Sequence, residues 1–384
     1  MRKKICVVIT ARPSYSRIKS ALEAIKNHPG LELQLVVAGS ALLDRYGKAS
    51  DYMELDGFEI KSKVFNILEG ENLTSMAKST GLAVMELANV FENIKPDMVI
   101  TIADRYETLA TSIAASYMNI PLVHTQGGEV TGNIDEKVRH ANTKLADVHF
   151  VTTEASKQRV LRLGEEESSI FVTGCPSIDI AVEVLEKPEL DFDPTQKYGG
   201  VGAPVDFGNG YIVVMQHPVT TEYEESKENI MKTLEAVHQL GYPTMWFWPN
   251  VDAGADGTSK GIRSYREKYN PDNIHFFKNM LPQDFLKILI NSRGIVGNSS
   301  VALRECAFLG VPAVNIGNRQ NGRDRGINVV DVNYDVSEIK EAIIKNYNIG
   351  KFEKDTVYGE GKAGEQFAEI LSSISPSIDK KITY

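Results

Sequence analysis

The sequence has few cysteines and no long apolar run. Its 384 residues include three cysteines, all isolated from one another, and this argues against a disulfide framework or a structural zinc site. The apolar runs are of strand length, far below the ~20 residues of a membrane span. The basic start leads into an apolar run that ends at Thr10, which predicts a first strand rather than a signal peptide. We therefore expect a cytoplasmic protein without membrane contact.

The sequence also lacks an excess of positive charge. Its formal net charge is −9, and such a field repels the phosphates of a nucleic acid. The loop 10–17 lacks the glycine fingerprint of dinucleotide-binding folds, which counts against an NAD enzyme. A small anionic ligand remains compatible, because basic residues lie in unusual loop sequences: Arg12, Arg17, Arg139, His217, Arg319, Arg323 and Arg325.

Apolar runs of strand length alternate with helical patterns along most of the chain. Predicted strands lie near 5–10, 33–38, 98–102, 122–125, 148–152, 211–215, 244–248, 273–276, 294–296 and 312–316. Strands separated by helices predict the α/β class, with parallel sheets covered by helices on both faces. The stretch 188–210 is rich in Gly, Pro and Asp and has no helical period, which predicts a linker or a long loop between two such units. We therefore expect two domains, 1–187 and 188–360.

The segment 297–312 is the most informative single stretch. It predicts a polar turn, a helix and a further strand near Pro312. Ser299 and Ser300 stand where the first N–H groups of a helix lack partners, a position that binds phosphate. Glu305 follows six residues later, ~9 Å along the helix, within reach of ribose hydroxyls. The alternative is that a serine only caps the helix and that Glu305 is a solvated side chain.

Further polar residues follow predicted strands or begin predicted helices, where open α/β sheets bind ligands. In chain order they are Arg12, Arg17, Asp104, Glu129, Asp135, Arg139 and His217. Two arginines at a helix start suit an anion, and glycines before Glu129 let the backbone approach a ligand. Plainer alternatives are exposed arginines, an ordinary turn, a surface ion pair between Asp135 and Arg139, and a structural histidine.

Several strings, taken in order, resemble the UDP-N-acetylglucosamine 2-epimerase family, most closely its hydrolysing branch in sialic-acid-type and legionaminic-acid-type sugar synthesis. The strings are 11–17 (ARPSYSR), 104–105 (DR), 127–132 (GGEVTG), 134–141 (IDEKVRHA), 216–221 (QHPVTT), 249–254 (PNVDAG) and 297–305 (GNSSVALRE). The resemblance covers nearly the whole chain. It implies a glycosyltransferase-B-like architecture, two Rossmann-like domains facing across a cleft, with a C-terminal helix, about 361–384, packing back on the first domain.

The resemblance also implies roles for individual residues. Asp104, Glu129 and Asp135 match the family's acidic candidates for proton transfer, and His217 matches a histidine near the phosphates. The substrate-binding positions are Arg12, Ser16, Arg17, Arg139, Asn250, Ser299, Ser300, Glu305 and Arg319. Gln126 stands where the non-hydrolysing branch has the glutamate of His-x-Glu-Ala-Gly. An amide cannot serve as an acid, and this argues against the non-hydrolysing reaction.

The implied reaction converts UDP-N-acetylglucosamine to UDP and N-acetylmannosamine, by elimination of UDP and hydration of a glycal. This chemistry needs no redox cofactor, and no ligand cluster in the sequence demands a metal. UDP-N,N′-diacetylbacillosamine stays open as an alternative substrate. A UDP-sugar-dependent glycosyltransferase of the same fold stays open as an alternative enzyme. A nucleotide-sugar sensor without turnover is the third reading, although the three carboxylates argue against it. We further expect a homo-oligomer, a dimer or a tetramer.

Overall fold

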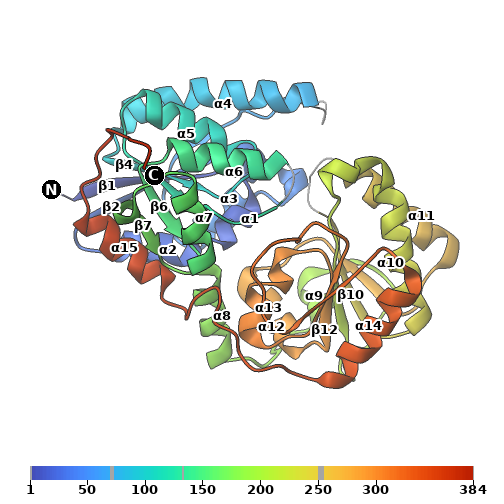
Figure 1. The fold of residues 1–384 in the computed structure, drawn as a ribbon. Helices are drawn as coiled ribbons and strands as arrows, with labels where there is room; N and C mark the ends of the chain where they lie inside the picture. Colours follow the sequence, from blue (N-terminus) through green and yellow to red (C-terminus); the bar gives the residue numbers. More distant parts are fainter. Residues whose placement is uncertain (1, 70–72, 132–133, 250–254, 384) are drawn as a thin grey trace. The chain divides into compact units, whose positions relative to one another are not determined.

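The chain forms two compact units. The computed structural model describes residues 2–69, 73–131, 134–249 and 255–383 (Figure 1). Unit 1 comprises 1–179 and 358–384, and unit 2 comprises 180–357. The boundary at Asp179 and Ile180 falls inside helix α8 (Pro176–Glu186). Each unit is built on a mainly parallel sheet with interleaved helices, which confirms the predicted α/β class.

Unit 1 contains a parallel sheet in the order β3-β2-β1-β4-β5-β6-β7. Its strands are β1 (Lys3–Ile9), β2 (Leu31–Ala38), β3 (Ile60–Val64), β4 (Met98–Ile102), β5 (Leu122–Thr125), β6 (Val148–Val151) and β7 (Ile170–Val172). The chain moves outward from β1 in one direction and resumes at β4 in the other. The carboxyl ends of β1 and β4 therefore form the switch point at which such sheets bind ligands.

Strand β1 is buried on both faces, because its alternating side chains belong to two different cores. Ile5, Val7 and Ile9 pack in one core with helices α2 (Lys19–Asn27) and α15 (Ala363–Ser373). Cys6 and Val8 pack in the other core with helices α4 (Leu73–Ile94) and α5 (Thr108–Tyr117). Unit 1 also contains α1 (Arg12–Ser16), α3 (Ala49–Leu55), α6 (Ile134–Leu145) and α7 (Glu154–Arg162).

Helix α15 brings the C-terminal part of the chain onto unit 1, where it lies beside α2 (Figure 1). Phe367 and Leu371 of α15 are buried in the same core as Ile5. The carboxylate of Asp179 accepts hydrogen bonds from the N–H groups of Ala363 and Gly364, at 3.0 and 2.7 Å. This carboxylate caps the first turn of α15, whose N–H groups have no helical partner.

Unit 2 contains a sheet in the order β14-β13-β12-β9-β10-β11-β8. Its strands are β8 (Val201–Gly202), β9 (Ile212–Met215), β10 (Thr244–Phe247), β11 (Ile274–Phe277), β12 (Gly294–Gly297), β13 (Ala313–Ile316) and β14 (Val329–Val332). Its helices are α9 (Pro194–Tyr198), α10 (Ser226–Leu240), α11 (Ala255–Tyr269), α12 (Pro282–Asn291), α13 (Glu305–Leu309) and α14 (Val336–Ile349). The switch point lies between β9 and β12.

The prediction that 188–210 is a linker or long loop without regular structure is wrong. Helix α9 and strand β8 lie in this stretch, and β8 pairs antiparallel with β11 at the edge of the sheet of unit 2. Both elements are short, and this explains why no helical or strand period is visible in the sequence. Among the described residues, no helix is long and apolar enough to cross a membrane.

Candidate functional site

Arg12 follows β1 at the switch point of unit 1. Burial lowers the pKa of Arg12 to about 10, so its guanidinium is still a cation at neutral pH. Its Nη1 atom is buried without a hydrogen-bond partner among the described residues. Ser16 lies one turn later in α1, where its hydroxyl donates to the Pro13 carbonyl at 3.0 Å, and Arg17 is the residue after the helix. A desolvated cation without a partner at a strand end suits an anionic ligand.

Asp104 and Arg139 form a buried ion pair, with 6% and 1% of their surface exposed. Asp104 follows β4, and Arg139 lies in the middle of α6. The structure therefore places Arg139 inside unit 1 against Asp104, rather than on a surface face of α6. Arg105 pairs instead with Glu107, at 3.2 Å. The Arg139 guanidinium therefore holds the Asp104 carboxylate in a charge pair at the end of β4.

Glu129 is also buried, with 3% of its surface exposed, and accepts a hydrogen bond from the Thr152 hydroxyl at 3.0 Å. The preceding Gly128 has φ +75, and a Cβ atom there would lie 2.2 Å from the carbonyl oxygen of Ser156. Only glycine fits this close approach to α7, so Gly128 fixes the loop that presents Glu129. Asp135 is half-buried in the first turn of α6.

Each of the adjacent strands β4 and β5 is followed directly by a residue with a left-handed backbone conformation. Ala103 has φ +59 and Gln126 has φ +63, conformations that cost a residue other than glycine of order 1 kcal/mol. His124 holds the backbone at Ala103 in this conformation, because its Nε2 lies 2.9 Å from the Ala103 carbonyl oxygen. Asn142 donates to the same oxygen at 3.2 Å. Such strain persists where the surroundings hold it and is common at functional sites.

The sequence analysis did not select His124, Asn142 or Thr143 as site residues. Burial lowers the pKa of His124 to about 3, so the ring is neutral and its Nε2–H donates to Ala103. Its Nδ1 then accepts from the Thr143 hydroxyl, at 3.1 Å. The only sequence signal for Asn142 and Thr143 as site residues was their position one helical turn after Arg139.

At the switch point of unit 2, the loop after β9 is tied to the end of β12. His217 is buried, and its N–H donates to Asn298 Oδ1 at 2.7 Å while Asn298 Nδ2 donates to the His217 carbonyl at 2.8 Å. Arg319 Nη1 and Gln320 Nε2 both donate to the Asn298 carbonyl, at 3.1 and 2.8 Å. Asn298 therefore organises His217 and Arg319, and it is a residue that the sequence reasoning did not select.

The prediction of one helix that runs from Ser299 past Glu305 is wrong. A 3₁₀ turn (Ser300–Ala302) is followed by the separate five-residue helix α13, which begins at Glu305. The Ser299 hydroxyl caps the turn by accepting from Val301 N at 3.4 Å, as the plainer alternative expected. At the break, the Asn328 side chain donates to the Ala302 carbonyl at 3.1 Å, an acceptor that the N–H of Cys306 would use in a continuous helix.

Glu305 is not the solvated side chain of the alternative reading, because only 7% of its surface is exposed. Its Oε2 atom is buried without a hydrogen-bond partner among the described residues. Ser299 and Ser300 are buried beside it in the same segment. Asn250, the remaining predicted ligand residue, lies outside the described residues.

The chain is similar in sequence to known proteins over nearly its whole length. The family model described as UDP-N-acetylglucosamine 2-epimerase matches residues 23–372. A relative from Legionella pneumophila, UDP-N,N'-diacetylbacillosamine 2-epimerase (hydrolyzing), is 33% identical over 374 residues, which cover 97% of each chain. UDP-N-acetylglucosamine 2-epimerase from Neisseria meningitidis is 28% identical over 376 residues, with 97% of this chain and 96% of the relative covered.

A solved structure supports the fold. The crystal structure of UDP-GlcNAc 2-epimerase from Neisseria meningitidis bound to UDP-GlcNAc superposes with a TM-score of 0.80 at 21% identity. The match covers 96% of this chain and 99% of that one. The family model matches most of the chain, and the resemblance seen in the sequence is confirmed: the chain belongs to the UDP-N-acetylglucosamine 2-epimerase family.

Proposed function

We propose that this protein is a hydrolysing UDP-N-acetylglucosamine 2-epimerase, which releases UDP and N-acetylmannosamine. The observation that carries the proposal is the pair of buried carboxylates, Asp104 and Glu129, that follow the adjacent strands β4 and β5 in unit 1. Adjacent strands lie ~4.8 Å apart. A site that only binds an anion would gain nothing from two buried carboxylates, whereas paired acids of different surroundings suit proton transfer.

The reaction proceeds by elimination and hydration. A carboxylate removes the proton from sugar carbon 2, the bond from carbon 1 to the phosphate oxygen breaks, and its electron pair leaves with UDP. The resulting alkene joins carbons 1 and 2. Water then adds its hydroxyl to carbon 1 and gives its other proton to a carboxylate. A carboxylic acid donates a proton to carbon 2 on the face opposite to the one from which the first proton was removed. Asp104, Glu129 and Asp135 supply the acid and base, with Arg139 holding Asp104 in place.

Basic and buried polar residues bind UDP as it leaves. Glu305 has a buried carboxylate oxygen without a partner, and the hydroxyls of a ribose would satisfy it. Arg12, Arg17 and Arg319 supply positive charge for the diphosphate, and His217, Ser16, Ser299 and Ser300 supply further donors. Asn250 completes this proposed set. Charge that develops on UDP as carbon 1 is released is stabilised by such pre-placed donors.

Gln126 supports the hydrolysing reaction over the non-hydrolysing one. Its amide nitrogen donates to Cys175 Sγ at 3.7 Å, and its backbone is left-handed. It occupies the place of the glutamate in the non-hydrolysing branch, and an amide cannot return a proton to a glycal. In the hydrolysing reaction water adds to carbon 1 in place of UDP, so free sugar is the product.

UDP-N,N′-diacetylbacillosamine is the second candidate substrate, because the Legionella pneumophila relative at 33% identity is named for it. Proton NMR of the purified protein with each nucleotide sugar tests both candidates. We expect UDP and a free 2-epimerised sugar without any acceptor. Transfer only when an acceptor is present would replace the proposal with a glycosyltransferase, and binding of UDP without turnover of either sugar would replace it with a sensor.

A further inference from the structure

The C-terminal tail, residues 374–383, ends on the loop between α7 and β7 in unit 1. Thr383 N–H donates to the Gly164 carbonyl, and the Thr383 hydroxyl donates to the Glu165 carbonyl, both at 3.1 Å. Gly164 has φ +83, and a Cβ atom there would lie 2.6 Å from Cγ1 of Ile382. A residue with a side chain at position 164 would push the tail away, so this loop is shaped to receive it.

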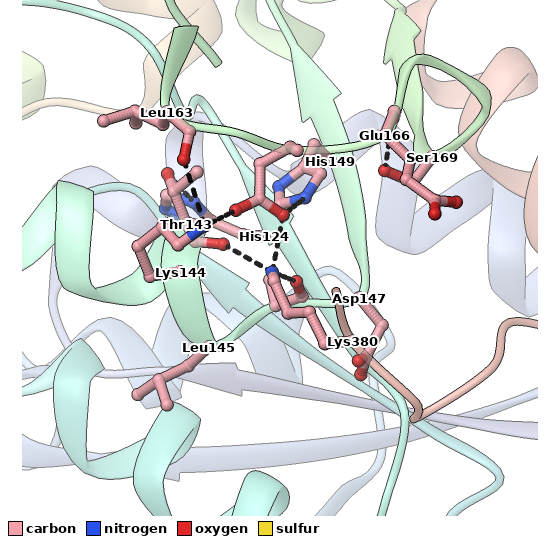
Figure 2. Close-up of polar contacts among 12 residues, drawn as sticks. His124, Thr143, Lys144, Leu145, Asp147, His149, Leu163, Glu166, Ser169 and Lys380 are labelled. Carbon is pink, nitrogen blue, oxygen red and sulfur yellow. Dashed lines mark hydrogen bonds and ion pairs between the residues drawn. The ribbon is translucent and has the colours of Figure 1, made fainter. Parts of the chain in front are cut away.

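The tail also reaches a buried carboxylate. Glu165, with 3% of its surface exposed, accepts from the Lys380 and Lys144 amino groups, each at 2.6 Å, and from His149 Nε2 at 3.0 Å. In Figure 2, dashed lines join Lys144, Lys380 and His149 to one carboxylate, which these contacts identify as that of Glu165. Charge-assisted hydrogen bonds in a buried setting are stronger than those at a surface, so the tail is anchored at a fixed point.

Lys380 connects this anchor to helix α6. Its amino group also donates to the carbonyls of Thr143, at 3.2 Å, and Ala146. These carbonyls lie at the end of α6, where the last acceptors lack helical partners and the helix dipole is negative. One ammonium group thus closes the helix end and joins it to Glu165.

Helix α6 carries much of the proposed acid–base site. Asp135 lies in its first turn, and Arg139 pairs with Asp104. In its last turn Asn142 binds the strained Ala103 carbonyl, and the Thr143 hydroxyl binds His124. Lys380 therefore binds the backbone of a residue whose side chain belongs to the network that holds Ala103 and Asp104.

We propose that Lys380 is a positioning residue for the acid–base site: it fixes the end of α6 against Glu165 and so keeps Ala103 and Asp104 in place for proton transfer. The catalytic consequence rests on the proposed function. The effect of Lys380 on the order of α6 does not depend on the proposed function.

The test compares Lys380→Met with the native protein, with Lys380→Arg and with Lys381→Met, a matched change at the exposed neighbouring lysine. We expect Lys380→Met to lower kcat roughly tenfold, because small misplacement of reacting groups is costly. The Kd for UDP should not change, since none of the residues that we assign to UDP lies in α6. Lys380→Arg keeps the cation and its donors and should restore most of kcat, and Lys381→Met should match the native protein.

Hydrogen–deuterium exchange at the amides of α6 gives a readout that does not need activity. We expect faster exchange near Thr143 in Lys380→Met alone. Native kcat in that variant, or native exchange of α6, would overturn the proposal, as would an equal loss in Lys381→Met. If the native protein converts no UDP-sugar, the proposed function fails while the exchange data still decide whether Lys380 orders α6.

Thr383→Val serves as a milder second variant if Lys380→Met does not fold. It removes the hydroxyl bond to the Glu165 carbonyl and leaves Lys380 in the chain. We expect a smaller fall in kcat with faster exchange in α6 and unchanged UDP affinity. Native values for both kcat and exchange in this variant would count against tail anchoring.

Discussion

Asn298 binds both backbone polar groups of His217, accepting from its N–H at 2.7 Å and donating to its carbonyl at 2.8 Å. The two residues follow β12 and β9, the central strands at the switch point of unit 2. A single buried amide thus holds together two segments about eighty residues apart in sequence. The geometry of the proposed phosphate side of the site depends on it.

Asn298→Ala should destabilise unit 2, because it leaves the buried N–H and carbonyl of His217 without their partner. The loss should be about 2–3 kcal/mol in the free energy of unfolding, the usual penalty for unsatisfied buried groups. Urea denaturation measures it. Asn348→Ala, at an exposed position of α14, is the control and should stay within about 0.5 kcal/mol. Equal small losses in both variants would contradict the role of Asn298.

Glu305→Ala should weaken UDP binding. Loss of hydrogen bonds between a charged carboxylate and ribose hydroxyls should cost roughly 1.5–3 kcal/mol, or about 10- to 150-fold in Kd. Isothermal titration calorimetry measures this directly. The exposed Glu341 in α14 offers a control, since Glu341→Ala should bind UDP as the native protein does. Unchanged UDP affinity in Glu305→Ala would remove the ribose assignment.

The carboxylate variants Asp104→Asn, Glu129→Gln and Asp135→Asn should each cut turnover by roughly 10²–10⁴-fold, the usual share of general acid–base catalysis. UDP affinity should be largely retained. Reaction of the native enzyme in deuterated water should place deuterium at carbon 2 of the released sugar. Retention of the original proton there, or full activity in all three variants, would exclude the mechanism.

Asp104→Asn and Glu129→Gln should differ in thermal stability. Asp104→Asn also breaks a buried ion pair with Arg139, and an uncompensated buried charge costs about 3–5 kcal/mol. Glu129→Gln keeps an acceptor for the Thr152 hydroxyl and should be less destabilised. Thermal melts followed by circular dichroism distinguish these effects, so that loss of activity in Glu129→Gln cannot be attributed to unfolding.

The buried His124 should make stability depend on pH. Burial lowers its pKa to about 3, against ~6.5 in an unfolded chain. Below pH ~6.5 the unfolded chain therefore binds a proton that the folded protein does not bind until about pH 3. The free energy of unfolding should fall on acidification in this window, by about 1.4 kcal/mol per pH unit from this group.

Urea titrations between pH 6 and pH 4 test this dependence on pH. His124→Asn removes the titrating ring, so the slope of the free energy of unfolding against pH should become shallower by about one proton. His28→Asn, in the loop after α2, is the control and should leave the contribution of His124 intact. An unchanged slope in His124→Asn would show that another group is responsible.

The sequence predicted the α/β class because the relevant information is local. Apolar runs such as 5–9 and 212–215 are buried in strands, and the helices between them show one apolar face. Polar residues at strand ends could be located for the same reason, since the carboxyl edge of a parallel sheet gathers whatever follows each strand. Arg12, Asp104 and His217 were found in this way.

Contacts between distant segments could not be predicted. The side chain of Asn328 binds the Ala302 carbonyl where the helix expected after Ser299 is broken, and β8 joins a sheet from a stretch with no visible period. Such features depend on which backbone groups are satisfied by residues far along the chain, and a local pattern does not carry that information.

The sequence by itself determined two parallel-sheet α/β units and the strand ends that carry their polar residues, because burial imposes a local period on strands and helices. Only the tertiary structure decided which groups are paired. It placed Arg139 against Asp104, left an oxygen of Glu305 without a partner among the described residues, and brought Lys380 to the end of α6. Pairing depends on the three-dimensional approach of segments, and desolvation then decides which charges are held in place and which remain available to a ligand.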